Sequence, residues 1–317
     1  MTAAASLVLP STPVSIKVST DEINALSLKN LEIATRAIHR YGLVVIENAI
    51  KPEALDHLNK KMIEDAYHLQ AKKDSPFNYN RGNIQQEPPL TKEYWDGMIY
   101  THPIVSQGTS SVLGPFPRLN FISGNTALPP NPGSSSTSQL THSDSDFDHP
   151  DCPLALVVNV PLVTMTPKNG STEIWLGTQC YDVSVQEGAN SDRASGRIKT
   201  EILEERRKIR APCQPIIPRG SIIIRDQRQW HNGRPNLTKI PRVMLAFIHF
   251  TPWYRNTMQI EFADELGPEL SREKKQLQIQ STLIPESEVL RSYLNRPYGN
   301  AYDFGQEDTV DGIFAGN

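Results

Sequence analysis

The amino-acid sequence predicts a mainly β fold, an antiparallel sandwich or barrel, with flanking helices. Apolar segments of strand length recur between turn signals from about residue 154 onward, and helical segments do not alternate with them. That order argues against a doubly wound parallel sheet and favours antiparallel pairing. Helical periodicity is instead concentrated before about residue 70, so helices come first in the chain.

The first helical region follows Ser19 and Glu22, which have the spacing of a capping box. Apolar side chains then repeat at helical spacing (Leu31, Ala34, Ile38), and Gly42 provides a C-terminal stop. The apolar run at 43–46 predicts a short strand directly after this stop.

A second helix is expected after position 51, because Pro52 suits a first helical turn. Leu55, Leu58 and Met62 share its apolar face. The stretch that follows, about 72–106, begins as an irregular segment rich in Asn, Gln and Pro. It carries four large aromatic side chains, namely Tyr79, Tyr94, Trp95 and Tyr100. Long irregular segments of compact proteins are usually functional or disordered, and these aromatics indicate a segment that packs or covers, so it is a candidate lid.

Five later segments have the composition of strands. They cover residues 154–160, 172–176, 214–217, 221–225 and 242–250. Pro218-Arg219-Gly220 predicts a tight turn between two of them. The charged stretches at 201–210 and 271–275 are expected to be solvated helical faces or excursions from the strands.

Length and composition bound the class of protein. A chain of 317 residues with 38% hydrophobic content can bury a large core, and we expect one elaborated domain. The net charge of -3 and the pI near 6.3, without a basic stripe, argue against nucleic-acid binding. No apolar stretch is long enough to cross a membrane. Three scattered cysteines fit a reducing compartment, so the expected location is the cytoplasm.

The most informative residues are His142 and Asp144, followed far downstream by His231. Positions i and i+2 of an extended segment point to the same side, so His142 and Asp144 can converge on one ion. His231 follows the apolar run 221–225 at a strand end and offers the third ligand. Two imidazoles and one carboxylate bind one face of Fe(II) and leave positions open for reaction partners. We therefore expect a reactive iron site.

Arg242 opens the next predicted strand, beside an apolar wall. Its planar guanidinium is suited to hold a carboxylate through two parallel hydrogen bonds. Taken singly, these residues have simpler interpretations, because an isolated arginine often forms a structural ion pair. Asp146, Asp148 and His149 lie close to the motif and are rival ligands, whereas the histidines at 39, 57, 68 and 249 are expected to be packed or on the surface.

Three motifs occur in a recognisable order. They are Gln139-Leu140-Thr141-His142-Ser143-Asp144, then Asn169-Gly170-Ser171-Thr172-Glu173-Ile174-Trp175-Leu176-Gly177-Thr178, then Trp230-His231-Asn232-Gly233 with Arg242. With them, the chain from about residue 41 to 254 resembles the phytanoyl-CoA dioxygenase family of Fe(II)- and 2-oxoglutarate-dependent oxygenases, in particular its fungal branch.

This resemblance implies a double-stranded β-helix, a cupin-like jelly roll of two antiparallel sheets with helices packed outside. It implies one oxygenase domain over residues 1–317. Its expected parts are an N-terminal helical region at about 19–70, the lid-like segment at about 72–106, a jelly-roll core at about 116–255 and a C-terminal extension at about 256–317. We expect the end of this extension, around 293–298, to pack on its own barrel.

The resemblance also implies roles for single residues. His142, Asp144 and His231 match the iron ligands, and Arg242 matches the residue that pairs with the distal carboxylate of 2-oxoglutarate. Gln139 and Thr172 match positions that contact this co-substrate. One position departs from the family, since relatives often have a histidine where this chain has Gln179. Glutamine forms hydrogen bonds but does not titrate, so substrate choice changes if that histidine shapes the pocket.

The implied reaction is an O2-dependent oxidation of a C–H bond, by hydroxylation, desaturation or a related outcome, with succinate and CO2 as co-products and ascorbate as an optional reductant. An aromatic lid predicts a small, largely apolar metabolite as substrate, of the kind found in secondary metabolism. Two alternatives remain open, a cupin-like metalloenzyme that does not use 2-oxoglutarate and a non-catalytic binding or partner subunit with this fold. Beyond the small-molecule substrate, a homodimer is compatible with the sequence.

Overall fold

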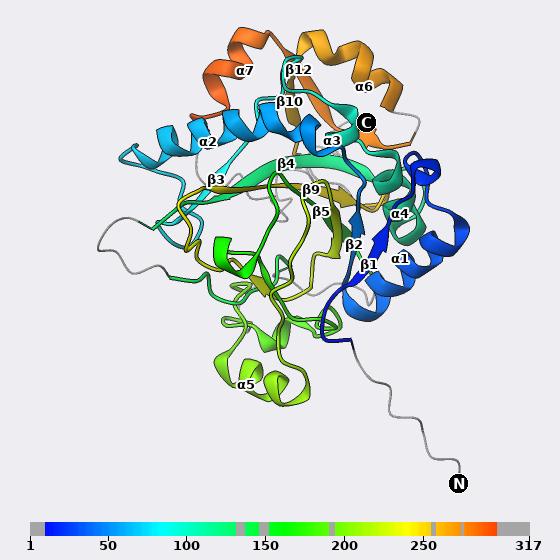
Figure 1. Ribbon diagram of the computed structural model, residues 1–317, viewed down its shortest axis with the longest axis vertical. Coiled ribbons are helices and arrows are strands. Elements are labelled where there is room, and N and C mark those ends of the chain that lie inside the picture. Colours follow the sequence, from blue (N-terminus) through cyan, green and yellow to red (C-terminus); the bar gives the residue numbers. More distant parts are fainter. Residues whose placement is uncertain are drawn as a thin grey trace, which may run out of the picture.

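An eight-stranded sheet forms the centre of the computed structural model, which describes residues 10–130, 137–145, 152–189, 194–254, 258–273 and 276–296. Figure 1 shows this sheet with helices packed around it. Its strands lie in the order β1 (Val14–Lys17), β2 (Leu43–Glu47), β7 (Ile222–Asp226), β5 (Ala155–Pro161), β9 (Arg242–Phe250), β4 (Arg118–Ala127) and β11 (Gln278–Ile279), and β3 (Asn83–Gln86) also pairs with β4.

Antiparallel pairing dominates the middle of the sheet. The pairs β2–β7, β7–β5, β5–β9 and β9–β4 are all antiparallel, whereas the edge pairs β1–β2 and β4–β11 are parallel. Neighbouring strands in this order are far apart in sequence, as a jelly roll requires and a simple meander does not. The expected fold class, mainly β with flanking helices, is confirmed.

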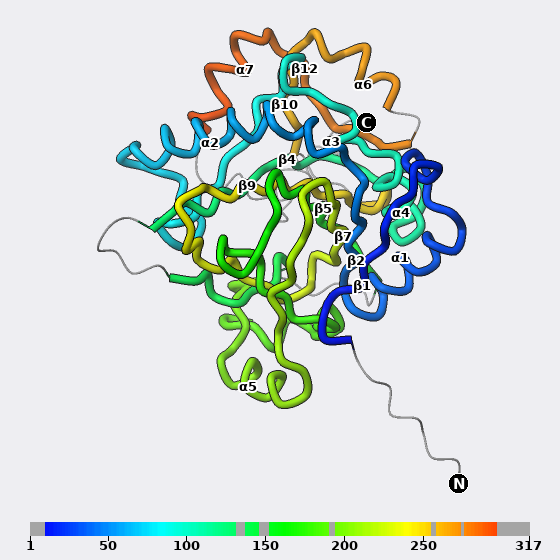
Figure 2. Tube along the Cα trace, in the orientation of Figure 1, coloured from blue at the N-terminus to red at the C-terminus, as the bar shows by residue number. Residues whose placement is uncertain are grey.

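Helices and short strands cover the outside of the sheet, as the chain trace in Figure 2 also shows. Helix α1 packs against β2 and α4, and α2 lies beside β3. The helices are α1 (Leu28–Tyr41), α2 (Asp56–Gln70), α3 (Gly97–Tyr100), α4 (Pro103–Leu113), α5 (Thr200–Ile209), α6 (Gly267–Glu273) and α7 (Glu286–Ser292), with β10 (Ile260–Ala263) and β12 (Ser281–Ile284) as a separate parallel pair. Among the described helices, none is both long and apolar enough to cross a membrane.

The two faces of the sheet have different partners. On β9, Val243, Leu245 and Phe247 belong to the main hydrophobic core, which includes residues of α1, α2 and α4. The alternate positions, including Arg242 and Met244, line a cavity on the opposite face. Because successive side chains of a strand point to opposite faces, one strand supplies both the core and the site.

A much smaller second layer closes the other side of this cavity. It contains the two-residue pair β6 (Glu173–Ile174) and β8 (His231–Asn232), extended by isolated bridges that join His142 to His231 and to Arg197. The jelly roll is therefore asymmetric, with one broad sheet and one short layer. The short layer carries residues of all three motifs found in the sequence, whereas Arg242 lies on the broad sheet.

Helix α1 begins later in the chain than the sequence predicted. Ser19 precedes only a short 3-10 turn, and α1 begins later, where the Ser27 hydroxyl accepts from the Asn30 N–H at 3.3 Å. Gly42 ends α1 as predicted, with a φ of 85° that favours glycine. The expected strand at 214–217 is absent, and only Ile217 forms an isolated bridge, because Pro215 lacks the N–H that a strand ladder needs.

The expected lid at 72–106 is mostly part of the body of the protein. Trp95 stacks on Tyr100 at 4.9 Å between ring centroids and contacts Phe262 edge-on, so this side chain packs against the hydrophobic core and does not line the cavity. Only the early part of the segment reaches the cavity, through Asn78, Tyr79 and Gln85. Near the other end of the chain, the Tyr293 hydroxyl donates to Asp65 of α2 at 2.9 Å, so this residue packs on the N-terminal helical region, and residues 297 and 298 of the expected contact lie outside the described residues.

Candidate metal centre

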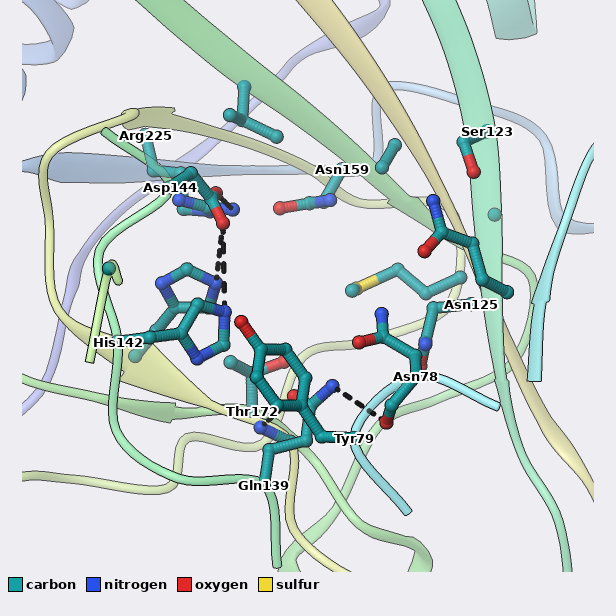
Figure 3. Close-up of a pocket in the computed structure, with 18 of the residues that line it drawn as sticks. Asn78, Tyr79, Ser123, Asn125, Gln139, His142, Asp144, Asn159, Thr172 and Arg225 are labelled. Atoms are coloured by element: carbon teal, nitrogen blue, oxygen red, sulfur yellow. Dashed lines mark hydrogen bonds and ion pairs between the residues drawn. The ribbon is translucent and has the colours of Figure 1, made fainter. Parts of the chain in front are cut away.

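The predicted ligands meet at the wall of a cavity of about 340 Å³ between the broad sheet and the short layer. One donor atom from each of His142, Asp144 and His231 lies within 4.8 Å of the others. Asp144 Oδ1 is 3.6 Å from Nε2 of both histidines, as the dashed lines in Figure 3 mark. The three side chains thus converge on one point, as the i, i+2 spacing predicted.

The backbone brings these separated residues together. The His142 N–H donates to the His231 carbonyl at 3.0 Å, and the His231 N–H donates back at 2.9 Å. This reciprocal pair is the hydrogen-bonded register of an antiparallel ladder, which places both side chains on one face. The Asp144 N–H then donates to Gln227 at 3.2 Å, which ties the carboxylate to the turn before His231.

Hydrogen bonds from the ring nitrogens fix the orientation of both imidazoles. His142 Nδ1 lies 2.9 Å from the Leu140 carbonyl, and His231 Nδ1 lies 3.0 Å from the Gln229 carbonyl. A carbonyl can only accept, so each Nδ1 carries the proton and each Nε2 carries the lone pair. Burial lowers the pKa of His142, and it lowers the pKa of His231 to about 3 with the help of nearby Arg225. Both rings are therefore neutral at pH 7, the form that binds a metal ion.

Asp144 is held by an arginine that the sequence interpretation missed. Nη2 of Arg225, on β7, donates to Asp144 Oδ2, while Asp144 Oδ1 faces the histidines. Burial alone raises the pKa of Asp144, but the charge and hydrogen bond of Arg225, joined at acid pH by the two histidines, outweigh it and hold this pKa far below its usual range. The sequence did indicate this residue, because Arg225 places a charge at the end of an apolar run, on the same strand face as Ile223.

Arg242 lies in the cavity wall as a buried cation without a carboxylate partner among the described residues. Its Nη2 donates to the Gly170 carbonyl at 2.9 Å, and Nη1 lies 3.5 Å from Asn125 Oδ1. Its Nε is buried and has no hydrogen-bond partner in the part of the chain that the structure describes. Burial lowers the pKa of Arg242 to about 10, which leaves it charged at pH 7. A charge in this setting is costly unless an anion pairs with it.

Gln139 and Thr172 also line this cavity. Gln139 Oε1 accepts from the Gly233 N–H at 2.6 Å, and a Cβ at position 233 would lie 2.5 Å from that oxygen. A side chain at position 233 would therefore displace the Gln139 carboxamide, which ties this glycine to the first motif. Gln179 lies elsewhere, since its Nε2 donates to the His39 carbonyl at the end of α1 at 2.8 Å. The substitution at position 179 therefore supports local structure and not the cavity.

The rival ligands Asp146, Asp148 and His149 lie outside the described residues. Of the histidines expected to be packed or exposed, His249 is fully buried and bonds Thr109, and the other three are on the surface. Cys152, Cys180 and Cys213 are free.

A comparison with protein families matches residues 38–244, more than half of the chain, to the family described as phytanoyl-CoA dioxygenase (PhyH). The chain belongs to the phytanoyl-CoA dioxygenase family. Membership of this family confirms the expected enzyme class, a non-haem iron and 2-oxoglutarate-dependent dioxygenase.

Solved structures resemble this member of the phytanoyl-CoA dioxygenase family in fold. The epimerase SnoN, in complex with Fe3+, alpha ketoglutarate and nogalamycin RO, is 15% identical over 73% of this chain and 88% of its own, with a TM-score of 0.55. EctD from S. alaskensis in its apoform is 16% identical over 87% of this chain and 93% of its own, with a TM-score of 0.52. Both likenesses support the jelly-roll assignment.

Proposed function

We propose that Nε2 of His142, Oδ1 of Asp144 and Nε2 of His231 bind one ferrous ion. The donor set fits this ion, because two neutral imidazoles and one carboxylate leave open positions on its other face. The fit is supported by the Nδ1 hydrogen bonds, which turn both lone pairs toward Asp144. Such outer contacts are typical of histidines that bind metals.

The observation that carries the co-substrate assignment is the unpaired charge of Arg242. Its side chain is buried in the wall of the cavity that holds the three ligands, and among the described residues no carboxylate pairs with it. The distal carboxylate of 2-oxoglutarate is an anion of the required kind, and we assign Arg242 to it. Gln139 and Thr172, from the first two motifs, are proposed as further contacts of the co-substrate.

The proposed reaction is the oxidation of a C–H bond in a small, largely apolar metabolite, by hydroxylation, desaturation or a related outcome, within secondary metabolism. The bound ion and 2-oxoglutarate supply the oxidising chemistry with O2, and succinate and CO2 are the co-products. Ascorbate is proposed as an accessory reductant. The protein's own residues orient both bound groups, and Phe121, Val157 and Ile248 provide an apolar wall that excludes water.

The test adds Fe(II) and then 2-oxoglutarate to the protein under anaerobic conditions. The absorbance of the weak visible charge-transfer band of the chelate is measured during the addition. We expect the band in the wild type, and we expect Arg242→Met to need about tenfold more 2-oxoglutarate, since a charge-assisted hydrogen bond is lost. Arg206→Met is the matched control, because Arg206 is also buried but donates to the Leu176 carbonyl outside the cavity.

Two results would contradict the proposal, namely no band in the wild type, or equal 2-oxoglutarate requirements in the wild type and Arg242→Met. The alternative of a cupin-like metalloenzyme that does not use 2-oxoglutarate predicts iron binding without release of labelled CO2 from the keto acid. A non-catalytic subunit predicts no oxygen-dependent product in a metabolite screen.

A further inference from the structure

Arg225 is the second buried cation in the wall of the cavity, and the two arginines lie at opposite ends of it. On β9, Arg242 is six residues before Ile248, about 20 Å along an extended strand. Ile248 pairs with Val157 on β5, and Val157 pairs with Arg225 on β7. Figure 3 shows Arg225 and Asp144 on one side of the cavity and Asn78 and Asn125, which lies next to Arg242, on the other. Arg225 therefore belongs to a different part of the site.

The two arginines have different neighbours on the sheet. The carboxamide Asn125 lies beside Arg242, and Met244 pairs with it across the strands. Arg225 shares its row of the sheet with Val157 and Ile248, which pack with Phe121 in an apolar cluster. An apolar surface with one cation is the kind of pocket that holds an apolar body bearing an acidic group.

Only half of the Arg225 guanidinium is used by the protein. Nη2 donates to Asp144, whereas Nη1 is buried and has no hydrogen-bond partner among the described residues. The Arg225 side chain is 9% exposed and lines the cavity. A guanidinium has a planar fork with parallel donors, so its second terminal nitrogen is positioned for another acceptor oxygen. Leaving such a donor unpaired in a buried site costs free energy that a ligand oxygen would recover.

The charges of the cavity point to an anionic ligand. Among the described lining residues the ionised side chains are Asp144, Arg225 and Arg242. A ferrous ion and a 2-oxoglutarate dianion cancel each other, so these three residues leave one net positive charge. A neutral substrate would leave that charge uncompensated in a buried cavity, whereas one carboxylate balances it.

We propose that Arg225 binds a carboxylate of the substrate, which makes the substrate class a small monocarboxylic acid with an apolar body beside Phe121, Val157 and Ile248. This inference rests on the proposed function, because it assigns the remaining half of the same cavity. Arg225 thus has two contacts, one with Asp144 through Nη2 and one with substrate through Nη1.

The experiment compares benzoate with benzamide, which have the same shape but differ in charge. Calorimetric titration uses the protein loaded with Mn(II) and 2-oxoglutarate, so that no turnover occurs. We expect the wild type to bind benzoate about tenfold more tightly than benzamide, and Arg225→Met to bind both equally. Arg228→Met is the matched control, because Arg228 pairs with Asp226 at 2.8 Å, does not line the cavity and is expected to leave the preference unchanged.

A second variant covers the case in which Arg225→Met does not fold. Arg225→Lys keeps a cation beside Asp144 but lacks the fork, so we expect a severalfold weaker preference for benzoate. The proposal is overturned if the wild type does not prefer benzoate, if a folded Arg225 variant keeps the full preference, or if benzoate competes with 2-oxoglutarate. Loading with Mn(II) and 2-oxoglutarate is measured first, and its failure in the wild type would instead contradict the proposed function.

Discussion

At the scale of single residues, the carboxylate at position 144 is divided between two tasks. Oδ1 faces the two histidines, and Oδ2 is taken by Arg225. This division leaves a single oxygen for a metal ion and prevents the carboxylate from rotating away from the histidines. The guanidinium of Arg225 would repel a metal ion bound so close to it. Asp144 would therefore have to offset the positive charge of Arg225 as well as that of the ion.

Asp144→Ala is therefore expected to be more damaging than the loss of one ligand. It removes a donor atom and leaves Arg225 without its partner beside the metal position, so we expect at least about a 100-fold loss of Fe(II) affinity and no detectable succinate. Equilibrium dialysis of Fe(II) under anaerobic conditions and a succinate assay measure the two effects. Asp226→Ala is the control, since Asp226 is buried in an ion pair outside the cavity. Near wild-type turnover in Asp144→Ala would remove this residue from the ligand set.

Two of the proposed ligands, His142 and Asp144, could be paired from the sequence because their spacing is a local property of the chain. His142 and Asp144 are two residues apart, and both Nδ1 contacts are with the carbonyl two residues earlier. Arg225 could not be assigned in the same way. Its partner lies 81 positions away, and the pairing depends on the order of strands in the sheet.

At the scale of elements, the strands that line the cavity were not equally predictable. Strand β4 was not expected, because its cavity face carries Ser123 and Asn125 and interrupts the apolar pattern. Strands β5, β7 and β9 were expected close to their observed bounds, because they are long apolar runs. A polar functional surface thus conceals a strand from an analysis based on apolar patterns.

A second element-scale feature is the link between the end of β3 and the C-terminal elements. Glu87 follows β3 and is buried, and Arg296 joins its carboxylate to that of Glu261 on β10. Burial outweighs the attraction of Arg296 and raises the pKa of Glu87 to about 7. The folded state therefore favours the protonated form of this acid.

This raised pKa predicts how the contribution of Glu87 to stability depends on pH. In the unfolded chain Glu87 has the ordinary glutamate pKa of 4.5, so the folded state binds more protons between pH 4.5 and 7 and loses stability as pH rises through this range. Glu87→Gln removes the ionisation. The free energy of unfolding of this variant minus that of the wild type is therefore expected to be about 3 kcal/mol larger at pH 8 than at pH 4. Urea unfolding at both pH values measures this, and parallel pH profiles of the two proteins would contradict it.

At the scale of the whole molecule, the site lies between the layer of the jelly roll with the least backbone pairing and the layer with the most. The broad sheet is held by long ladders, whereas the opposite layer has one two-residue pair and several isolated bridges. The proposed ligands His142 and His231 belong to this short layer, and Arg225 and Arg242 belong to the broad sheet. This asymmetry could not be predicted from the sequence, because single bridges leave no periodic pattern.

A metal ion should therefore stabilise the short layer in particular. An ion that binds the folded state alone contributes about 2.7 kcal/mol at 100 times its dissociation constant, which corresponds to a rise of several degrees in Tm for a chain of this size. We expect this rise on anaerobic addition of Fe(II), and we expect slower hydrogen exchange at 139–145 and 229–233 with little change in β5 and β9. His142→Ala should lose both effects. His57→Ala should keep them, because His57 is exposed and pairs with Glu93. Equal Fe(II)-induced shifts in the two variants would show that the ion binds elsewhere.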